Sequence, residues 1–533
     1  MAIPVYYSDG PSGNAMAVVE REWPRMSVLA ADPVKGHSRL RSEGSGPLTT
    51  RADLVSKGLS MILCAIVGVV ASLDAALPVA YVCLLFSFVL LCFVAGRNPQ
   101  TRIVALAFVS MLFLFIVGNA VNVLAWQLEA GPLDAVLPKL LGVVNLAQVL
   151  EVYRTLTYCV IGLTVGLLFA GRRPPGHQIV KRLNPFSAGG LTRVPMVLYV
   201  ALIVSAACSL LRSWDIWRFV GQSSYVSYYV EYTTSLPTIV AHGAIALDVI
   251  FFTVLVMVRS GRALVIPTII YLGASAFTLM TGRRGQFMIP LLIVMVFFFH
   301  RAFARPDSPP RHFGGRVVIV LLFVVVPMMV LMQALFGYRT GSSVGLSPLD
   351  FLSGQGGSIT TVGYVVLLGA GLPDKPYAFG TILARLRGYV CRGDICAPMP
   401  STQSVERVMM TPQLSDTLTY AIAPHAYLSG YGYGSSFVAE LLAQFGLIGV
   451  FLGSVFYGLL IIAVSRLLSS DSVIPAVFGL VIAQRLFFSP RSGFSDFLLE
   501  LVSSQNLVWL SCVLLIMHWR PRRQVSSPGN GSG

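Results

Sequence analysis

Four arginines lie beside long apolar stretches of this sequence, where a charged side chain is costly. Arg283 and Arg284 form the turn TGRRG, Arg339 lies in FGYRTG, and Arg491 lies in SPRSG. A guanidinium group presents a planar fork of donors that pairs with phosphate oxygens. An arginine retained next to an apolar span usually has an anionic partner. The four residues therefore predict a site for a diphosphate group, and Arg284 is also expected to act in catalysis.

A second group of polar residues lies in the segment 415–449, SDTLTYAIAPHAYLSGYGYGSSFVAELLAQFGLIG. His425 could serve as an acid, a base or a hydrogen-bond donor. Glu440 falls in the first turn of a predicted helix, where the helix dipole favours a negative charge. The rings and hydroxyls of Tyr427, Tyr431 and Tyr433 suit contacts with sugars. We therefore expect His425 and Glu440 to be catalytic and the three tyrosines to bind glycan.

The composition indicates that lipid surrounds most of the elements that position these residues. The 533 residues are 55% apolar and only 11% charged, whereas soluble domains carry roughly 25% charged residues. Apolar runs of about 20 residues can cross a bilayer as helices. A β-barrel would instead show alternating segments of about 10 residues. We predict an all-α polytopic membrane protein with about 12 transmembrane helices, at roughly 59–73, 76–95, 103–126, 155–171, 195–211, 237–258, 263–280, 287–302, 317–336, 437–465, 473–489 and 497–518.

The distribution of charge predicts the orientation. With both termini in the cytoplasm (N-in/C-in), most of the 38 Lys and Arg residues fall on the cytoplasmic side, as the positive-inside rule requires. The net charge of +15 then reflects topology, and no nucleic acid partner is expected. The predicted order is a disordered cytoplasmic tail without a cleavable signal peptide (1–55), helices 1–9 (56–336), a large external loop (337–436), helices 10–12 (437–519) and a second cytoplasmic tail (520–533).

Each candidate residue also has a purely structural interpretation. The TGRRG pair could reach the lipid headgroups without binding a ligand, and Arg491 could pair with Asp496. Arg339 could contact headgroups at the end of a span. His425 could bond to nearby backbone, and Glu440 could serve only the start of its helix or bond to another helix.

Two further features lie in or near the predicted spans. Tyr225, Tyr228, Tyr229 and Tyr232 have the spacing of one helix face. They predict a helix at the membrane interface, and they favour an aromatic belt over a sugar platform. Asp248 lies inside a predicted span and must face the protein interior, where it is expected to pair with an arginine or form a structural hydrogen bond.

The cysteines and the acidic residues indicate no metal or cofactor. Of the eight cysteines, six lie in apolar spans, where cysteine behaves as a small hydrophobic residue. Cys391 and Cys396, in CRGDIC, are expected to form a short disulfide if their loop faces an oxidising compartment. Their spacing does not match a zinc site. No DxD or DD pair is present to hold Mg²⁺, so we expect a metal-free mechanism without a cofactor.

The segment GYGYGSSFVAELLAQFGLIGVFLGSVFYGLL resembles the late segment of bacterial O-antigen polymerases of the Wzy type, and the TGRRG turn is also similar to that family. The resemblance implies a GT-C-like membrane glycosyltransferase of the inner membrane, with its active site facing the periplasm. The implied substrates are oligosaccharide repeat units on undecaprenyl diphosphate, with a chain-length regulator as partner. A hydroxyl of one unit would attack the anomeric carbon of another, and the lipid diphosphate would leave. External arginines would neutralise its growing charge, beneath a long loop that acts as lid and acceptor platform.

Two other functions remain open at this point. PHAYL resembles the HNxYL-type motif of O-antigen ligases, which use the same donor, but Ala426 replaces the asparagine. A lipid-linked oligosaccharide flippase or a polysaccharide exporter should show two similar halves, and no repeat is visible.

Asp74 lies in the first predicted external loop, where many polyprenyl-dependent membrane glycosyltransferases carry their base.

Overall fold

The structure is a computed structural model of the chain. It describes residues 46–73, 76–97, 99–120, 141–169, 193–223, 227–258, 262–281, 285–303, 330, 334, 354–391, 399–400, 402–470, 472–499, 503, 506, 508–509 and 511. The chain divides into two compact units, Met1–Ser56 and Lys57–Gly533. Every element from α2 onward belongs to the second unit. The last part of the predicted 1–55 tail already belongs to a helix, α1 (Gly46–Ser72).

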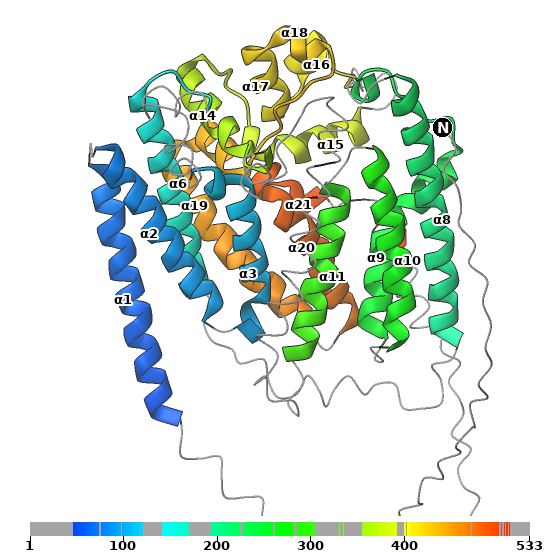
Figure 1. The fold of residues 1–533 in the computed structure, drawn as a ribbon, viewed down its shortest axis with the longest axis horizontal. Coiled ribbons are helices and arrows are strands. Elements are labelled where there is room, and N and C mark those ends of the chain that lie inside the picture. The colour runs from blue at the N-terminus through cyan, green and yellow to red at the C-terminus, as the bar shows by residue number, and fades with distance from the viewer. Residues whose placement is uncertain are drawn as a thin grey trace, which may run out of the picture. The chain divides into compact units, whose positions relative to one another are not determined.

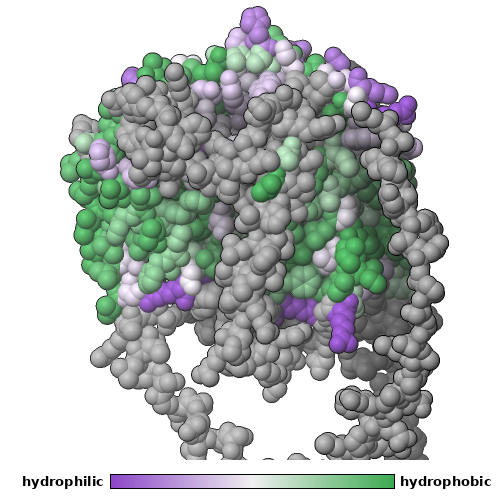
Figure 2. Space-filling view, in the orientation of Figure 1, coloured by the Kyte–Doolittle hydropathy of each residue, from purple (hydrophilic) through white to green (hydrophobic). Residues whose placement is uncertain are grey.

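Helices make up the fold, and no strand occurs among the described residues. Within that part of the chain, nine helical segments are long and apolar enough to cross a membrane. Figure 1 shows these helices standing side by side, and Figure 2 shows that hydrophobic residues cover much of the middle of the face in view. The protein is therefore an all-helical, multi-pass membrane protein. The segments contain α1, α2 (Leu77–Gly96), α3 (Pro99–Leu112) with η1 (Phe113–Val117), α6 (Leu146–Phe169), α8 (Arg193–Gln222), α9 (Thr238–Met257), α10 (Val265–Phe277) between η3 (Arg262–Leu264) and η4 (Thr278–Thr281), α19 (Phe437–Leu468) and α20 (Val473–Phe488).

Most predicted spans coincide with a helix. The span at 287–302 corresponds to the shorter α11 (Gly285–Phe303), and the spans at 317–336 and 497–518 lie mostly outside the described residues. Several helices are longer than predicted; for example, α1 begins at Gly46, α6 begins at Leu146 and α8 continues to Gln222. Charged residues lower the hydropathy at those ends, but they do not break a helix. The span number and the N-in/C-in orientation stay predictions.

The predicted interfacial helix over 225–232 is wrong. Ser227–Tyr229 forms a single 3-10 turn, and residues 232–235 have no regular structure. The tyrosine rings meet through this turn instead: Tyr228 stacks on Tyr232 with centroids 4.9 Å apart, and Tyr232 donates a hydrogen bond to Asp215 of α8. Tyr225 lies outside the described residues. The helix-like spacing of these tyrosines therefore belongs to a turn that packs against α8, and it does not mark a helix.

The long helices form two groups. α6 packs against α2 and α19, with α3 beside them, while α8 packs against α9 and α10. α11 and α20 contact members of both groups and join them. α6 and α19 approach each other closely: a β-carbon at Gly458 would lie 2.7 Å from the Leu163 carbonyl oxygen.

Gly458→Ala is expected to destabilise the protein by about 1–3 kcal/mol, because overpacking a close contact forces the backbones apart. Thermal unfolding in detergent measures the effect. Gly273→Ala, on α10, is the matched control, since nothing lies within 4 Å of the added methyl group. Equal melting temperatures for the two variants would contradict the importance of the α6–α19 contact.

The start of α19 folds back on the rest of the helix. Phe437 and Tyr457 would be about 30 Å apart along a straight helix, yet their rings stack at 4.6 Å. The reversal occurs at Gly446, whose φ of 64° favours glycine. A β-carbon at Gly453 would lie 2.5 Å from Leu441 of the folded-back segment. The glycine at position 453 thus leaves room for the beginning of the same helix.

The described part of the predicted external loop 337–436 forms a cap of short helices at one end of the long ones (Figure 1). α14 packs against both α6 and α19, so the cap rests on the spanning helices. The side of the membrane on which it lies stays a prediction. The cap consists of α14 (Ser358–Leu368), η7 (Tyr377–Phe379), α15 (Gly380–Val390), α16 (Val405–Met410), α17 (Leu414–Ile422) and α18 (Pro424–Leu428).

Candidate functional site

A cavity of about 710 Å³ lies where the two helix groups meet. Its walls come from α3, α8, α9, α10, α11 and α20, with one face closed by the turn that follows α20. A cavity of this size among spanning helices offers a polar ligand a place beside the bilayer. We call it the arginine cavity, after three residues in its wall: Arg212, Arg485 and Arg491.

The three arginines reach the arginine cavity from different elements. Arg212 comes from α8, Arg485 from the last turn of α20, and Arg491 from the turn η8 (Ser489–Arg491). Arg485 and Arg491 have exposed side chains although their neighbours are buried, because they face this cavity. Three guanidinium groups around one space create a positive potential that favours an anion.

Arg491 is oriented by two contacts. Its Nη1 donates a hydrogen bond of 3.3 Å to Oε1 of Gln355, and its guanidinium carbon lies 5.6 Å from the centroid of the Phe115 ring. Gln355 and Phe115 also line the cavity. A planar guanidinium held against a ring has a fixed orientation in the cavity wall.

The turn that carries Arg491 is held by α19. α20 ends at Phe488 because Pro490 has no backbone N–H to continue the helix. Beyond the turn, Phe494 donates its backbone N–H to Oε2 of Glu440 at 2.7 Å and accepts a hydrogen bond from the Tyr457 hydroxyl at 2.5 Å. The reversal at Gly446 brings Glu440 and Tyr457 together, so two residues of α19 form hydrogen bonds to the backbone N–H and C=O of Phe494.

Glu440 does not line the arginine cavity. It is 3% exposed, and its second oxygen, Oε1, accepts a hydrogen bond from Ser435 at 2.9 Å. These contacts are those of a positioning residue, which holds the turn after α20. The catalytic role of Glu440 stays a prediction. The alternative partner proposed for Arg491, Asp496, accepts a hydrogen bond from the backbone N–H of Gly493.

The remaining arginines predicted to bind diphosphate lie outside the described residues. These are Arg283, Arg284 and Arg339. The first two are followed directly by Gly285 and Gln286, which line the arginine cavity. Their assignment to the diphosphate stays a prediction, and so does the role of Asp74, which also lies outside the described residues.

The other predicted residues belong to the cap, away from the cavity wall. His425 is exposed on α18, Tyr431 is 56% exposed, and Tyr433 is half-buried with its ring 4.8 Å from that of Tyr364. Tyr427 is fully buried, and burial raises the pKa of its phenol. Tyr427 therefore offers no ring face to a sugar in this structure, whereas Tyr431 does.

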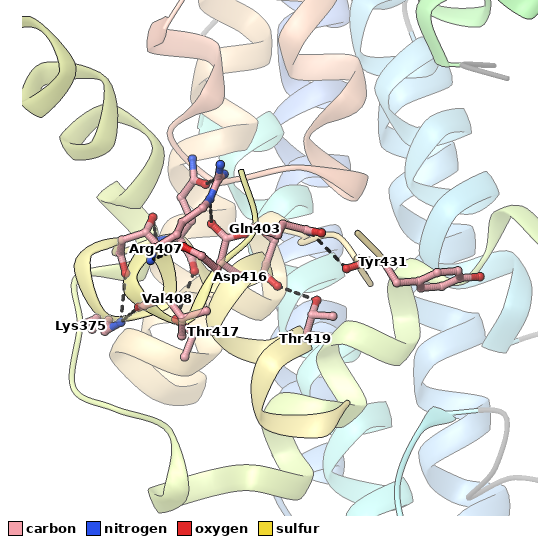
Figure 3. A network of polar contacts seen from close by, with 12 residues as sticks. Lys375, Gln403, Arg407, Val408, Asp416, Thr417, Thr419 and Tyr431 are labelled. Carbon is pink, nitrogen blue, oxygen red and sulfur yellow. Dashed lines mark hydrogen bonds and ion pairs between the residues drawn. The ribbon is translucent and has the colours of Figure 1, made fainter. Parts of the chain in front are cut away.

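A polar network fixes the shape of the cap (Figure 3). Arg407 of α16 forms an ion pair with Asp416 of α17 at 3.0 Å, and Lys375 donates to the carbonyl oxygens of Val408 and Thr411. Burial lowers the pKa of Lys375, although the Asp416 carboxylate opposes this shift. The same network reaches the exposed tyrosine, because Gln403 donates to the Tyr431 carbonyl oxygen at 3.2 Å.

Two residues of the cavity received little weight in the sequence. Arg212 directly follows the predicted span 195–211, and Arg485 lies near the end of the predicted span 473–489. Charge retained within a helix was the available signal.

Cys391 is disulfide-bonded, and its expected partner Cys396 lies outside the described residues. Among described residues, no group of three His, Cys, Asp or Glu side chains is placed to hold a metal ion.

Comparison with known proteins supports the resemblance found in the sequence. Residues 58–521 match the family model described as O-antigen polysaccharide polymerase Wzy. No curated protein and no solved structure matches the chain. The matched region contains the arginine cavity, the turn after α20 and the cap. Because the match extends over most of its length, the chain belongs to the O-antigen polysaccharide polymerase Wzy family.

Proposed function

We propose that this protein joins oligosaccharide repeat units carried on undecaprenyl diphosphate, on the periplasmic side of the bacterial inner membrane. The observation that carries the proposal is the convergence of Arg212, Arg485 and Arg491 on one cavity between spanning helices. The diphosphate of the donor binds these arginines, while its polyprenyl tail remains in lipid. A chain-length regulator is the partner that the family resemblance suggests.

The reaction transfers a glycan from the lipid diphosphate to a hydroxyl of a second unit. As the bond between the anomeric carbon and the phosphate oxygen breaks, negative charge grows on the diphosphate. Arginines already in place stabilise this charge without reorganising. Holding two large glycans in contact supplies a further part of the rate. The exposed Tyr431 and the cap around it are suited to guide the acceptor glycan.

The experiment supplies purified protein in detergent with lipid-diphosphate repeat units alone. A ladder of longer lipid-linked glycans supports the polymerase. Product that forms only after addition of a lipid A core would instead identify a ligase. Movement of the units across liposome membranes without any new glycosidic bond would identify a flippase. The described structure favours neither of these alternatives by a specific contact.

A further inference from the structure

The arginine cavity contains a carboxylate that the diphosphate does not need. Asp248, from the middle of α9, lines the cavity and is the one acidic residue among the described residues of its wall. A carboxylate inside a spanning helix is expensive and usually serves a function. We propose that Asp248 is the general base that accepts the proton of the attacking hydroxyl. This inference rests on the proposed polymerase function.

Rigid neighbours hold the Asp248 carboxylate in place. Oδ1 accepts a hydrogen bond from the Tyr271 hydroxyl at 2.8 Å, and Oδ2 accepts one from Nε2 of Gln484 at 2.7 Å. The Tyr271 ring is fully buried and stacks on Phe251 with centroids 3.9 Å apart. The two contacts therefore fix the orientation of the Asp248 carboxylate in the cavity wall.

One helix, α20, connects the base with the anion site. Gln484, which holds Asp248, directly precedes Arg485 on α20, and both side chains line the cavity. A diphosphate on the arginines and an acceptor hydroxyl at Asp248 would therefore share one space. The residues that the sequence suggested for proton transfer do not meet this condition, because His425 is exposed on the cap and Glu440 is bonded to Phe494.

The proposed transfer forms one bond, breaks one bond and moves one proton. The acceptor hydroxyl transfers its proton to an Asp248 oxygen while its own oxygen bonds to the anomeric carbon. The bond from that carbon to the diphosphate oxygen breaks, and its electron pair leaves with the diphosphate. The arginines bind the additional negative charge. Protonated Asp248 then returns its proton to water or to the departing diphosphate, which regenerates the carboxylate.

The test measures single-turnover transfer with saturating lipid-linked repeat units. Asp248→Asn keeps the size of the side chain and one of its two acceptor oxygens, but it cannot take up a proton. We expect it to lower the transfer rate by about 100-fold or more, as removal of a general base typically does, with little change in donor KM. Asp215→Asn, which changes a hydrogen-bonded aspartate of α8 outside the cavity wall, should leave the rate within about threefold of wild type.

Chemical rescue separates a base from a structural group. Formate added to Asp248→Ala should restore part of the transfer rate, because a small carboxylate can occupy the space left in the cavity. Failure of formate to rescue a folded Asp248→Ala protein overturns the proposal, as does a near wild-type rate for Asp248→Asn. A wild-type protein that forms no polymer would contradict the proposed function itself. An active wild type with an unaffected Asp248→Asn variant would contradict only the role of Asp248.

Discussion

Arg491→Ala is expected to reduce polymer formation by about 100-fold or more, the usual cost of removing one donor that stabilises developing charge. Arg491 is held by Gln355 and lies against Phe115, so its guanidinium is directed at the arginine cavity before substrate arrives. Quantified ladders of lipid-linked glycan, together with kcat and KM for the donor, measure the loss. We expect kcat to fall more than KM rises, because the charge on the leaving diphosphate increases during the reaction.

Two further variants sharpen this prediction. Arg491→Lys should recover part of the activity, because it restores the positive charge but not the planar fork of donors. Arg218→Ala is the matched control, since Arg218 is exposed on α8 and does not line the cavity. Full activity in Arg491→Ala, or an equal loss in Arg218→Ala, would remove the basis for placing the diphosphate in this cavity.

Glu440→Ala is the second change with a large expected effect. It leaves the backbone N–H of the partly buried Phe494 without its partner, which costs about 1–3 kcal/mol, and it loosens the turn that presents Arg491. Activity should fall by about 10-fold or more, since each 1.4 kcal/mol corresponds to a factor of ten. Assays of ladder formation and thermal unfolding in detergent should both register the change.

Glu440→Gln distinguishes a positioning residue from a catalytic one. The glutamine oxygen can accept the Phe494 hydrogen bond, and its amide can donate to the Ser435 hydroxyl. We therefore expect activity within a few-fold of wild type. Ser435→Ala, which removes only the other contact of Glu440, should also be mild. An inactive but stable Glu440→Gln protein would show that the carboxylate takes part in proton transfer after all.

Hydropathy predicted much of the fold because lipid imposes a simple rule on sequence. A segment that crosses a bilayer must be apolar and must satisfy its own backbone, so runs such as 76–95 and 237–258 correspond directly to α2 and α9. The rule fails at helix ends. α8 continues through Trp214, Asp215 and Trp217 because helix formation depends on backbone hydrogen bonds, whereas a hydropathy window registers only the charge.

The candidate site was predicted in part, for an equally physical reason. An arginine beside an apolar span is conspicuous in any sequence, and Arg491 indeed lines the cavity. Arg212 and Asp248 were harder to interpret, because their meaning depends on which side chains from other helices face them. Sequence spacing on one helix does not contain that information.

The sequence by itself determined the class of this protein: an apolar chain of spanning helices with arginines at their ends and the late segment of the Wzy family. The tertiary structure alone decided which charges share a space and which side chains merely hold them. The reversal at Gly446 places Glu440 and Tyr457 on either side of Phe494. The junction of α9 with α20 places Asp248 beside Gln484. These contacts join residues far apart in the chain, and they exist only because packing brings their helices together.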